Sequence, residues 1–197
     1  MIRAIIFDCF NVLVGDATKQ LLYELDQHDH DKRQQFSAIT HAVDKGIIPD
    51  NEAITEQSKL LGMSEAEFID LRNKGEVRNE PLLRYAESLK GEYKIGMLSN
   101  VSSKERLAIR FEPGQLDTLF DAVVASGDVG VIKPSPEIFA IAAAQLGVLP
   151  EECVMIDDIL ENCHGAEDAG MKAILHVNNQ QTITDLKALI DRGGERG

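Results

Sequence analysis

The sequence contains few cysteines and no long apolar run, and both absences limit what the protein can be. Its three cysteines form an odd number and lack the Cys-x-x-Cys spacing of zinc and redox motifs. This count favours reduced thiols, and therefore a cytoplasmic protein, over a disulfide scaffold. No apolar run approaches the roughly 20 residues of a membrane-spanning helix. The short apolar run near the N-terminus ends in Asp8, unlike a signal peptide.

Basic residues are also scarce. Lysine and arginine number 20 against 33 aspartate and glutamate residues, which gives a formal net charge of −13. Nucleic acids and anionic membranes carry negative charge themselves, so we expect neither as a partner. The acidic surface identifies no partner of its own and leaves the oligomeric state open, because surface charge first of all keeps a protein soluble.

Short apolar runs alternate with helical patterns along most of the chain. Such a run is typical of a strand that is buried on both faces of a sheet. The runs lie at residues 4–7, 95–98, 122–125, 154–156 and 173–177. Helical patterns lie at residues 103–111, 136–147, 161–170 and 182–192, with Gly147 as an expected C-cap. This alternation predicts an α/β fold with a parallel sheet.

Residues 16–90 differ from the rest because they carry helical patterns only. We expect helices at residues 21–26, 31–45, 51–61, 65–73 and 80–90. Ser64 and Glu67 have the spacing of a capping box, which predicts that one of these helices begins at residue 65. The sequence therefore predicts an all-helical insertion after the first strand.

Polar residues follow the apolar runs where the strands are expected to end. Asp8 follows the first run, Ser99 and Asn100 follow the second, and Asp157 and Asp158 follow the fourth. One such residue alone is most often the N-cap of the next helix. Together they are expected to meet, because the carboxyl ends of parallel strands form one ligand-binding edge. Three carboxylates at one spot repel one another unless a cation intervenes, and Mg²⁺ prefers such oxygen ligands.

A lysine lies in the stiff segment before one of the predicted helices. Lys133 precedes Pro134, and Pro136 follows shortly after, so the backbone has little freedom here. A lone lysine before a helix is usually a solvated surface charge. Next to a carboxylate site, Lys133 would instead neutralise Asp8 and an incoming anion.

Four segments of the chain resemble, in order, the four motifs of the haloacid dehalogenase-like (HAD) hydrolase superfamily. They are residues 7–13 (FDCFNVL), 98–100 (LSN), 130–139 (GVIKPSPEIF) and 157–170, which begins DDILEN. Each motif is short, and their order and strand-end placement carry the resemblance. It implies a Rossmann-like three-layer α/β/α core of residues 1–15 and 91–197. Residues 16–90 would form a small all-helical cap.

The resemblance also implies an activity and a set of site residues. The chain would be a Mg²⁺-dependent phosphatase that acts on a small phosphorylated metabolite through an aspartyl-phosphate intermediate on Asp8. Ser99 and Lys133 would act on the transferring group as further catalytic residues. Substrate contacts are expected from Phe10, Asn11 and Asn100. The metal ligands would be Asp8, the carbonyl of Phe10, Asp157 and Asp158, with Asn162 in support.

The first motif departs from the family pattern at Phe10. Most phosphatases of the superfamily carry a second aspartate there, which protonates the leaving group and then activates water. Phenylalanine transfers no proton, and loss of a general acid/base typically costs a factor of about 10²–10⁴ in rate. An activated leaving group, a substrate hydroxyl, water or a cap residue would have to replace it. His30 and His41 are candidates within the expected cap.

Phe10 leaves two alternatives to a phosphatase. In 2-haloacid dehalogenases a tyrosine occupies this position, and halide leaves without a proton. The adjacent Asp157 and Asp158 disfavour that activity, because they would repel an anionic haloacid and those enzymes need no metal. Lys19 is also a poor substitute for the arginine that binds the haloacid carboxylate. A protein without turnover, acting in binding or regulation, is the other alternative, although the remaining motif residues argue against it.

Overall fold

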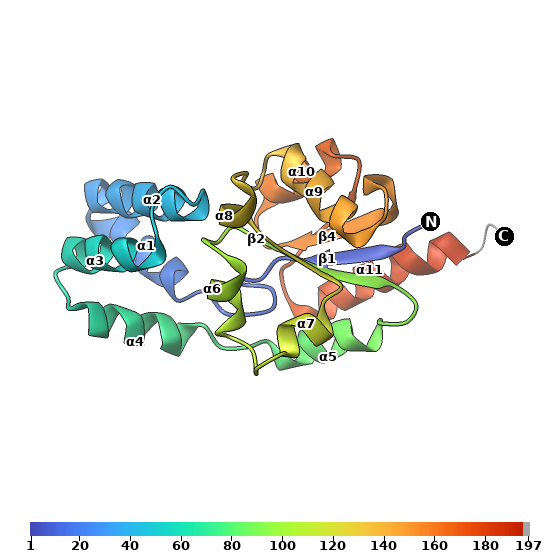
Figure 1. The fold of residues 1–197 in the computed structure, drawn as a ribbon, viewed down its shortest axis with the longest axis horizontal. Coiled ribbons are helices and arrows are strands. Elements are labelled where there is room, and N and C mark those ends of the chain that lie inside the picture. The colour runs from blue at the N-terminus through green and yellow to red at the C-terminus, as the bar shows by residue number, and fades with distance from the viewer. Residues whose placement is uncertain (195–197) are drawn as a thin grey trace.

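The computed structural model describes residues 1–194, and a five-stranded parallel sheet forms its centre (Figure 1). The strands are β1 (Ala4–Phe7), β2 (Lys94–Ser99), β3 (Ala122–Ala125), β4 (Cys153–Asp157) and β5 (Lys172–Leu175). They lie in the order β3-β2-β1-β4-β5, and every neighbouring pair is parallel. Each strand overlaps one apolar run, so the predicted α/β fold with a parallel sheet is confirmed.

The chain changes direction across the sheet at β1, which has β2 on one side and β4 on the other. Such a switch point opens a crevice at the carboxyl ends of the strands. Phe7 pairs with Ile156 of β4, and the backbone N–H of Asp8 donates to the carbonyl of Ile156 at 2.8 Å. This register brings Asp8 level with Asp157, the last residue of β4.

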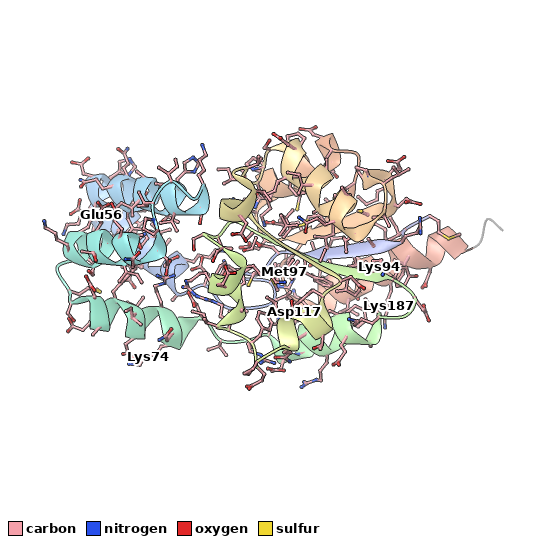
Figure 2. The ribbon with its side chains drawn as sticks, viewed as in Figure 1. Glu56, Lys74, Lys94, Met97, Asp117 and Lys187 are labelled. Carbon is pink, nitrogen blue, oxygen red and sulfur yellow. The ribbon has the colours of Figure 1, made fainter. Side chains whose placement is uncertain are left out.

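Helices cover both faces of the sheet, as the three-layer prediction requires. One face carries α9 (Pro136–Leu146) and α10 (Leu160–Asp168). The other carries α5 (Glu80–Ser88), α7 (Gln115–Leu119) and α11 (Asn179–Gly194). Side chains of β1 alternate between the two layers: Ile5 and Phe7 pack toward α5 and α11, and Ala4 and Ile6 toward α9. All four are fully buried, and Figure 2 shows Met97 of β2 in the same interior.

Short helices complete the core. They are α6 (Lys104–Ala108), α8 (Ser126–Val129) and the 3₁₀ turn Pro150–Glu152. The helix α6 is shorter than the predicted 103–111, because the chain turns after Ala108. Gly147 ends α9 with φ 71°, a left-handed conformation that glycine adopts without strain, and this confirms the predicted C-cap. None of the helices within residues 1–194 combines the length and apolar character needed to cross a bilayer.

Four helices stand apart from the sheet, at the left of Figure 1. They are α1 (Ala17–His28), α2 (His30–Asp44), α3 (Asp50–Leu61) and α4 (Glu65–Gly75), here called the inserted bundle. Helices α1 and α3 each pack against both α2 and α4. Phe36 and Phe68 are fully buried, and their rings meet edge to face at 6.1 Å. Ser64 and Glu67 form both bonds of the predicted capping box, and α4 begins at residue 65.

The helix α5 packs with the sheet and not with the inserted bundle. Leu82, Leu83 and Ala86 belong to the same buried cluster as Ile5 and Phe7 of β1. The sequence analysis placed this segment in a cap of residues 16–90, because a helical pattern reveals an apolar face without indicating what covers it. From these contacts we propose that the insertion ends near residue 77.

The two segments that connect the inserted bundle to the core run side by side. Val14 and Arg78 form an antiparallel bridge, and the N–H of Gly15 donates to the carbonyl of Val77 at 2.8 Å. A Cβ atom on Gly15 would lie 2.3 Å from the carbonyl oxygen of Gly75, so only glycine fits at this crossing. The chain therefore enters and leaves the bundle at one place.

Candidate active site

The strand ends bring Lys133 between two buried carboxylates. Its Nζ lies 2.9 Å from Oδ1 of Asp8 and 2.6 Å from Oδ2 of Asp157. It also donates to the carbonyl of Leu98 at 3.2 Å. Lys133 is 3% exposed and Asp157 0%. Burial of ions is costly unless they are paired and hydrogen-bonded, and each of these charges has a partner.

Burial and charge act in opposite directions on the pKa of each group. Burial raises the pKa of Asp8 above its usual range, Lys133 opposes that rise, and Asp157 and Asp158 add to it. Burial lowers the pKa of Lys133, but Asp8 and Asp157 raise it more, so it lies above its usual range. Lys133 is therefore charged at neutral pH, and a cation beside Asp8 would further favour the ionised form of that carboxylate.

Asn100 holds the backbone of Lys133. Its Oδ1 accepts from the N–H of Lys133 at 2.8 Å, and its Nδ2 donates to the carbonyl of Lys133 at 3.1 Å. Both ends of the amide are thus engaged with one residue. Asn100 lines the cavity, as expected of a substrate contact, but these bonds make it first of all a positioning residue for Lys133.

Ser99 supplies a buried hydroxyl without a partner. The residue is 1% exposed, and its Oγ has no hydrogen-bond partner among the described residues. Ser99 lines the same cavity as Asp8 and Lys133. A buried hydroxyl that is left unpaired costs free energy, so Ser99 is suited to bond an oxygen of a bound ligand.

Three carboxylates form a candidate metal site. Asp8, Asp157 and Asp158 each offer an oxygen atom, and these atoms lie within 4.8 Å of one another. Both oxygens of Asp157 are already engaged, because Oδ2 accepts from Lys133 while Oδ1 accepts from the N–H of Ile159 and from Nδ2 of Asn162.

The other two carboxylates each keep an oxygen for a ligand. The bonds of Asp8 involve Oδ1, and the bond of Asp158 involves Oδ2, so one oxygen of each has no hydrogen bond among the described residues. This oxygen donor set fits a hard divalent cation such as Mg²⁺. The bonding pattern favours Asp8 and Asp158 as direct ligands, with Asp157 and Asn162 supporting them.

Phe10 and Asn11, from which substrate contacts are expected, both line the cavity. Asn11 has φ 57°, a left-handed conformation that asparagine tolerates better than most residues, and it turns the chain after β1. The guanidinium of Arg110 lies 5.3 Å from the centre of the Phe10 ring. The side chain of Phe10 therefore offers a packing surface, and only its backbone carbonyl is a possible metal ligand.

A cavity of about 290 Å³ lies between the strand ends and the inserted bundle. Its core side includes Asp8, Ser99, Lys133 and Asp158, and its bundle side includes Leu22, Thr40, Val43, Asp44, Ala53 and Gln57. Nζ of Lys19, at the start of the bundle, binds Oδ2 of Asp158 at 2.9 Å. The bundle thus closes over the carboxylates and contacts one of them directly.

Neither histidine that the sequence analysis considered as a substitute acid reaches the cavity. His30 and His41 are absent from its lining, and the His30 ring pairs with Asp26 at 3.4 Å. Both residues are exposed, so this structure gives the hypothesis no support.

Asp44 is the site residue that the sequence analysis missed. It is the last residue of α2 and lines the cavity. Burial raises its pKa from 3.8 to about 7, against the opposing effect of Lys133. No signal in the sequence separates Asp44 from the other polar residues of the bundle, because only the packing of α2 against the core brings it to the site.

A charged network joins the inserted bundle to the core beside the cavity. Nε of Arg106 lies 3.3 Å from Oδ2 of Asp50, and its Nη2 lies 3.2 Å from Oε1 of Glu76. Glu76 also binds Arg110 and contacts Arg72 of α4. Burial raises the pKa of Glu76, although the arginines oppose the rise. This side of the cavity is therefore held by ion pairs between bundle and core.

Comparison with known proteins decides the family. The model of the haloacid dehalogenase-like hydrolases matches residues 2–170. The chain belongs to the haloacid dehalogenase-like hydrolase family. The structure of a HAD-like family hydrolase from Porphyromonas gingivalis has a TM-score of 0.75 to this one and 26% sequence identity, covering 96% of this chain and 98% of that one.

Two further proteins resemble this HAD hydrolase, one in fold and one in sequence. A HAD family enzyme of Bacteroides thetaiotaomicron, in complex with magnesium and inorganic phosphate, shares the fold with a TM-score of 0.75 at 20% identity, covering 93% of this chain and 99% of that one. A phosphatase of Mycobacterium tuberculosis is 32% identical over 108 residues, which are 51% of this chain and 50% of that protein. The match thus spans half the length of that phosphatase.

Proposed function

We propose that this HAD hydrolase is a Mg²⁺-dependent phosphatase that acts on a small phosphorylated metabolite through phosphorylation of Asp8. The observation that carries the proposal is the buried pair of Asp8 and Lys133 at the core side of the cavity, beside the unpartnered hydroxyl of Ser99. A carboxylate nucleophile, a fixed cation and a free hydrogen-bond donor are the groups that phosphoryl transfer to an enzyme requires.

Each residue would have a defined part in the reaction. Asp8 attacks the phosphorus atom and becomes an aspartyl phosphate, which water then hydrolyses. Lys133 neutralises charge on Asp8 and on the transferring group, and Ser99 donates a hydrogen bond to one of its oxygens. Mg²⁺, held by Asp8, Asp158 and the carbonyl of Phe10, would supply further charge neutralisation on the phosphoryl oxygens.

The cavity supports a small substrate. Its volume of about 290 Å³ lies at the lower end of ligand pockets in proteins. Because the inserted bundle forms one side of the cavity, its side chains would contact the part of the substrate away from the phosphate. The bundle would therefore set which phosphorylated metabolite is accepted.

A dehalogenase is the second candidate, and the arrangement of charges disfavours it. Asp157 and Asp158 lie beside Asp8 and would repel a haloacid carboxylate. Lys19 is engaged with Asp158, so it does not offer a free cation for that carboxylate. The feature that favours a dehalogenase is Phe10, because halide leaves without a proton and needs no acidic side chain at this position.

The test is hydrolysis of p-nitrophenyl phosphate by the purified protein with Mg²⁺ and with excess chelator. We expect release that requires Mg²⁺ and falls to background in Asp8→Asn, while Asp168→Asn, an exposed aspartate on α10, leaves it unchanged. Absence of release from this activated ester would refute a phosphatase. Chloride release from 2-chloropropionate would then identify a dehalogenase, and failure of both assays would indicate a binding protein.

A further inference from the structure

The first motif leaves the proposed phosphatase without a proton donor. An alkoxide or phenoxide leaving group departs slowly unless an acid protonates it, and Phe10 has no proton to give. A replacement must carry a proton near neutral pH and must reach the cavity that contains Asp8. It must also be held in a fixed position relative to Asp8, because proton transfer requires hydrogen-bond contact.

Six carboxylates line the cavity, and five of them already have a hydrogen-bond or ion-pair partner. They belong to Asp8, Asp16, Asp44, Asp50, Glu76 and Asp158. Lysines pair with Asp8 and Asp158, and arginines pair with Asp50 and Glu76. Asp16 accepts hydrogen bonds from both the N–H and the hydroxyl of Thr18 as the N-cap of α1. Of these six, only the carboxyl of Asp44 has neither a hydrogen bond nor an ion pair with a described residue.

The end of α2 that carries Asp44 is fastened to the core. The hydroxyl of Ser126, which is fully buried, donates to the carbonyl of Asp44 and accepts from the N–H of Val101 at 2.9 Å. Two residues later the chain passes so close to α8 that a Cβ atom on Gly46 would lie 2.8 Å from the carbonyl oxygen of Gly127. Although Asp44 belongs to the inserted bundle, its backbone is therefore fixed to α8, and through Ser126 to the loop that follows β2.

We propose that Asp44 is a catalytic residue that acts as the general acid and then as the general base, a role that the side chain of Phe10 cannot fill. This inference rests on the proposed phosphatase function. In the first step, an oxygen of Asp8 bonds to phosphorus while the bond between phosphorus and the leaving oxygen breaks. The proton of the Asp44 carboxylic acid passes to that oxygen, and an alcohol or phenol departs.

The second step restores both groups. Water attacks the phosphorus of the aspartyl phosphate, and the Asp44 carboxylate accepts one of its protons. The bond between phosphorus and Asp8 breaks, which releases inorganic phosphate, the Asp8 carboxylate and the protonated Asp44. The overall change is phosphate ester plus water to alcohol plus phosphate, without an oxidant or a further reactant.

The surroundings of Asp44 raise its pKa, so that a share of the carboxyl groups still holds a proton near neutral pH. Burial is the largest cause that raises its pKa to about 7, and Lys133 lowers it. Three further carboxylates raise it, namely Asp8, Asp16 and Asp50. On the side of α8, Asp128 is exposed and accepts from the N–H of Lys104. Asp44 also ends a helix, where the negative pole of the backbone dipoles disfavours a carboxylate.

The decisive measurement is the dependence of kcat/KM on the leaving group. A series of substituted phenyl phosphates, from p-nitrophenyl to unsubstituted phenyl, varies the basicity of the leaving oxygen with little change in shape. Because kcat/KM reports the transfer to Asp8, we expect Asp44→Asn to retain most of its rate on p-nitrophenyl phosphate. Its rate should fall increasingly below wild type as the leaving group becomes more basic, with a loss of up to about 10²–10⁴.

The controls separate the possible failures. Asp31→Asn, an exposed aspartate on the same helix, should follow the wild-type dependence. Hydrolysis of p-nitrophenyl phosphate by Asp44→Asn shows that the variant folds, and Asp44→Glu should recover part of the lost rate. A parallel dependence in Asp44→Asn and wild type, at whatever rate, would overturn the role of Asp44. A wild-type protein inactive on the whole series would instead overturn the phosphatase function, and the role of Asp44 with it.

Discussion

At the scale of single residues, Lys133 is the group on which the site depends. Its ammonium lies within hydrogen-bond distance of two carboxylates and a carbonyl, and the residue is almost completely buried at the base of the cavity. Its position is set by Pro134 on one side and by the amide of Asn100 across the cavity edge. A fixed cation of this kind needs no rearrangement when negative charge develops beside it.

Removing Lys133 is expected to destabilise the protein as well as inactivate it. Lys133→Met leaves Asp8 and Asp157 buried without their cation, and breaking such a buried pair typically costs about 3–5 kcal/mol in the free energy of unfolding. Lys19→Met removes a lysine whose side chain is 64% exposed, and it should cost less than about 1 kcal/mol. Urea unfolding at pH 7 measures both. Equal stabilities for the two variants would contradict this account of the buried network.

The sequence predicted the residues at the strand ends because their positions follow from chain geometry alone. Asp8, Ser99 and Asp157 end or follow apolar runs, and parallel strands place such ends at one edge. The role of Asn100 toward Lys133 was not predictable, since it depends on hydrogen bonds between two loops. Asp44 was not predictable either, because its side chain reaches the site only through the packing of one helix on the core.

At the scale of elements, the contact between α2 and α8 fixes the position of the C-terminal end of α2. Ser126 lies at the start of α8 and bonds both Asp44 of the bundle and Val101 of the core. A Cβ atom on Gly127 would lie 2.1 Å from the carbonyl oxygen of Ser102, so the three backbone segments are in close contact. This packing leaves α2 little freedom to slide over the core.

Loss of the Ser126 hydroxyl is expected to weaken both stability and turnover. Ser126→Ala leaves the N–H of Val101 and the carbonyl of Asp44 without their partner, which should cost about 1–3 kcal/mol. Ser64→Ala removes the capping box of α4, at a cost of about 0.5–2 kcal/mol. Only Ser126→Ala should also change the leaving-group dependence of kcat/KM. An unchanged dependence would show that Ser126 stabilises the fold without positioning Asp44.

The helix α5 illustrates what pattern analysis leaves open at this scale. Its existence and length were predicted well, and its apolar face is buried as expected. What the pattern lacks is the identity of the surface that covers that face. Segments next to an insertion are most exposed to this ambiguity, because either neighbour can bury them.

At the scale of the whole molecule, Asp44 should make the free energy of unfolding depend on pH. Its pKa is raised from 3.8 to about 7 in the folded protein. A group that binds its proton more tightly when folded stabilises the fold at low pH, and this contribution is lost as the pH rises through the folded pKa. The free energy of unfolding of the wild type should therefore fall between pH 4 and pH 7 relative to that of Asp44→Asn.

Thermal or urea unfolding across that range, with Asp31→Asn as the control, measures the difference. Asp8 and Glu76 also have raised pKa values and contribute in the same direction to all three proteins. Subtracting one profile from another therefore isolates Asp44. Profiles of identical slope for wild type and Asp44→Asn would show that the carboxyl is as well solvated in the folded chain as in the unfolded one.

The two segments that connect the inserted bundle to the core lie side by side, so the bundle should be replaceable as one unit. Gly15 and Val77 are hydrogen-bonded neighbours, so the core chain is interrupted at a single point in space although some sixty residues lie between them. We expect that a short turn between these positions would close the core with little movement of β1 or α5. If the bundle sets specificity as proposed, grafting helical bundles from related chains at the same two residues should exchange that specificity as a unit.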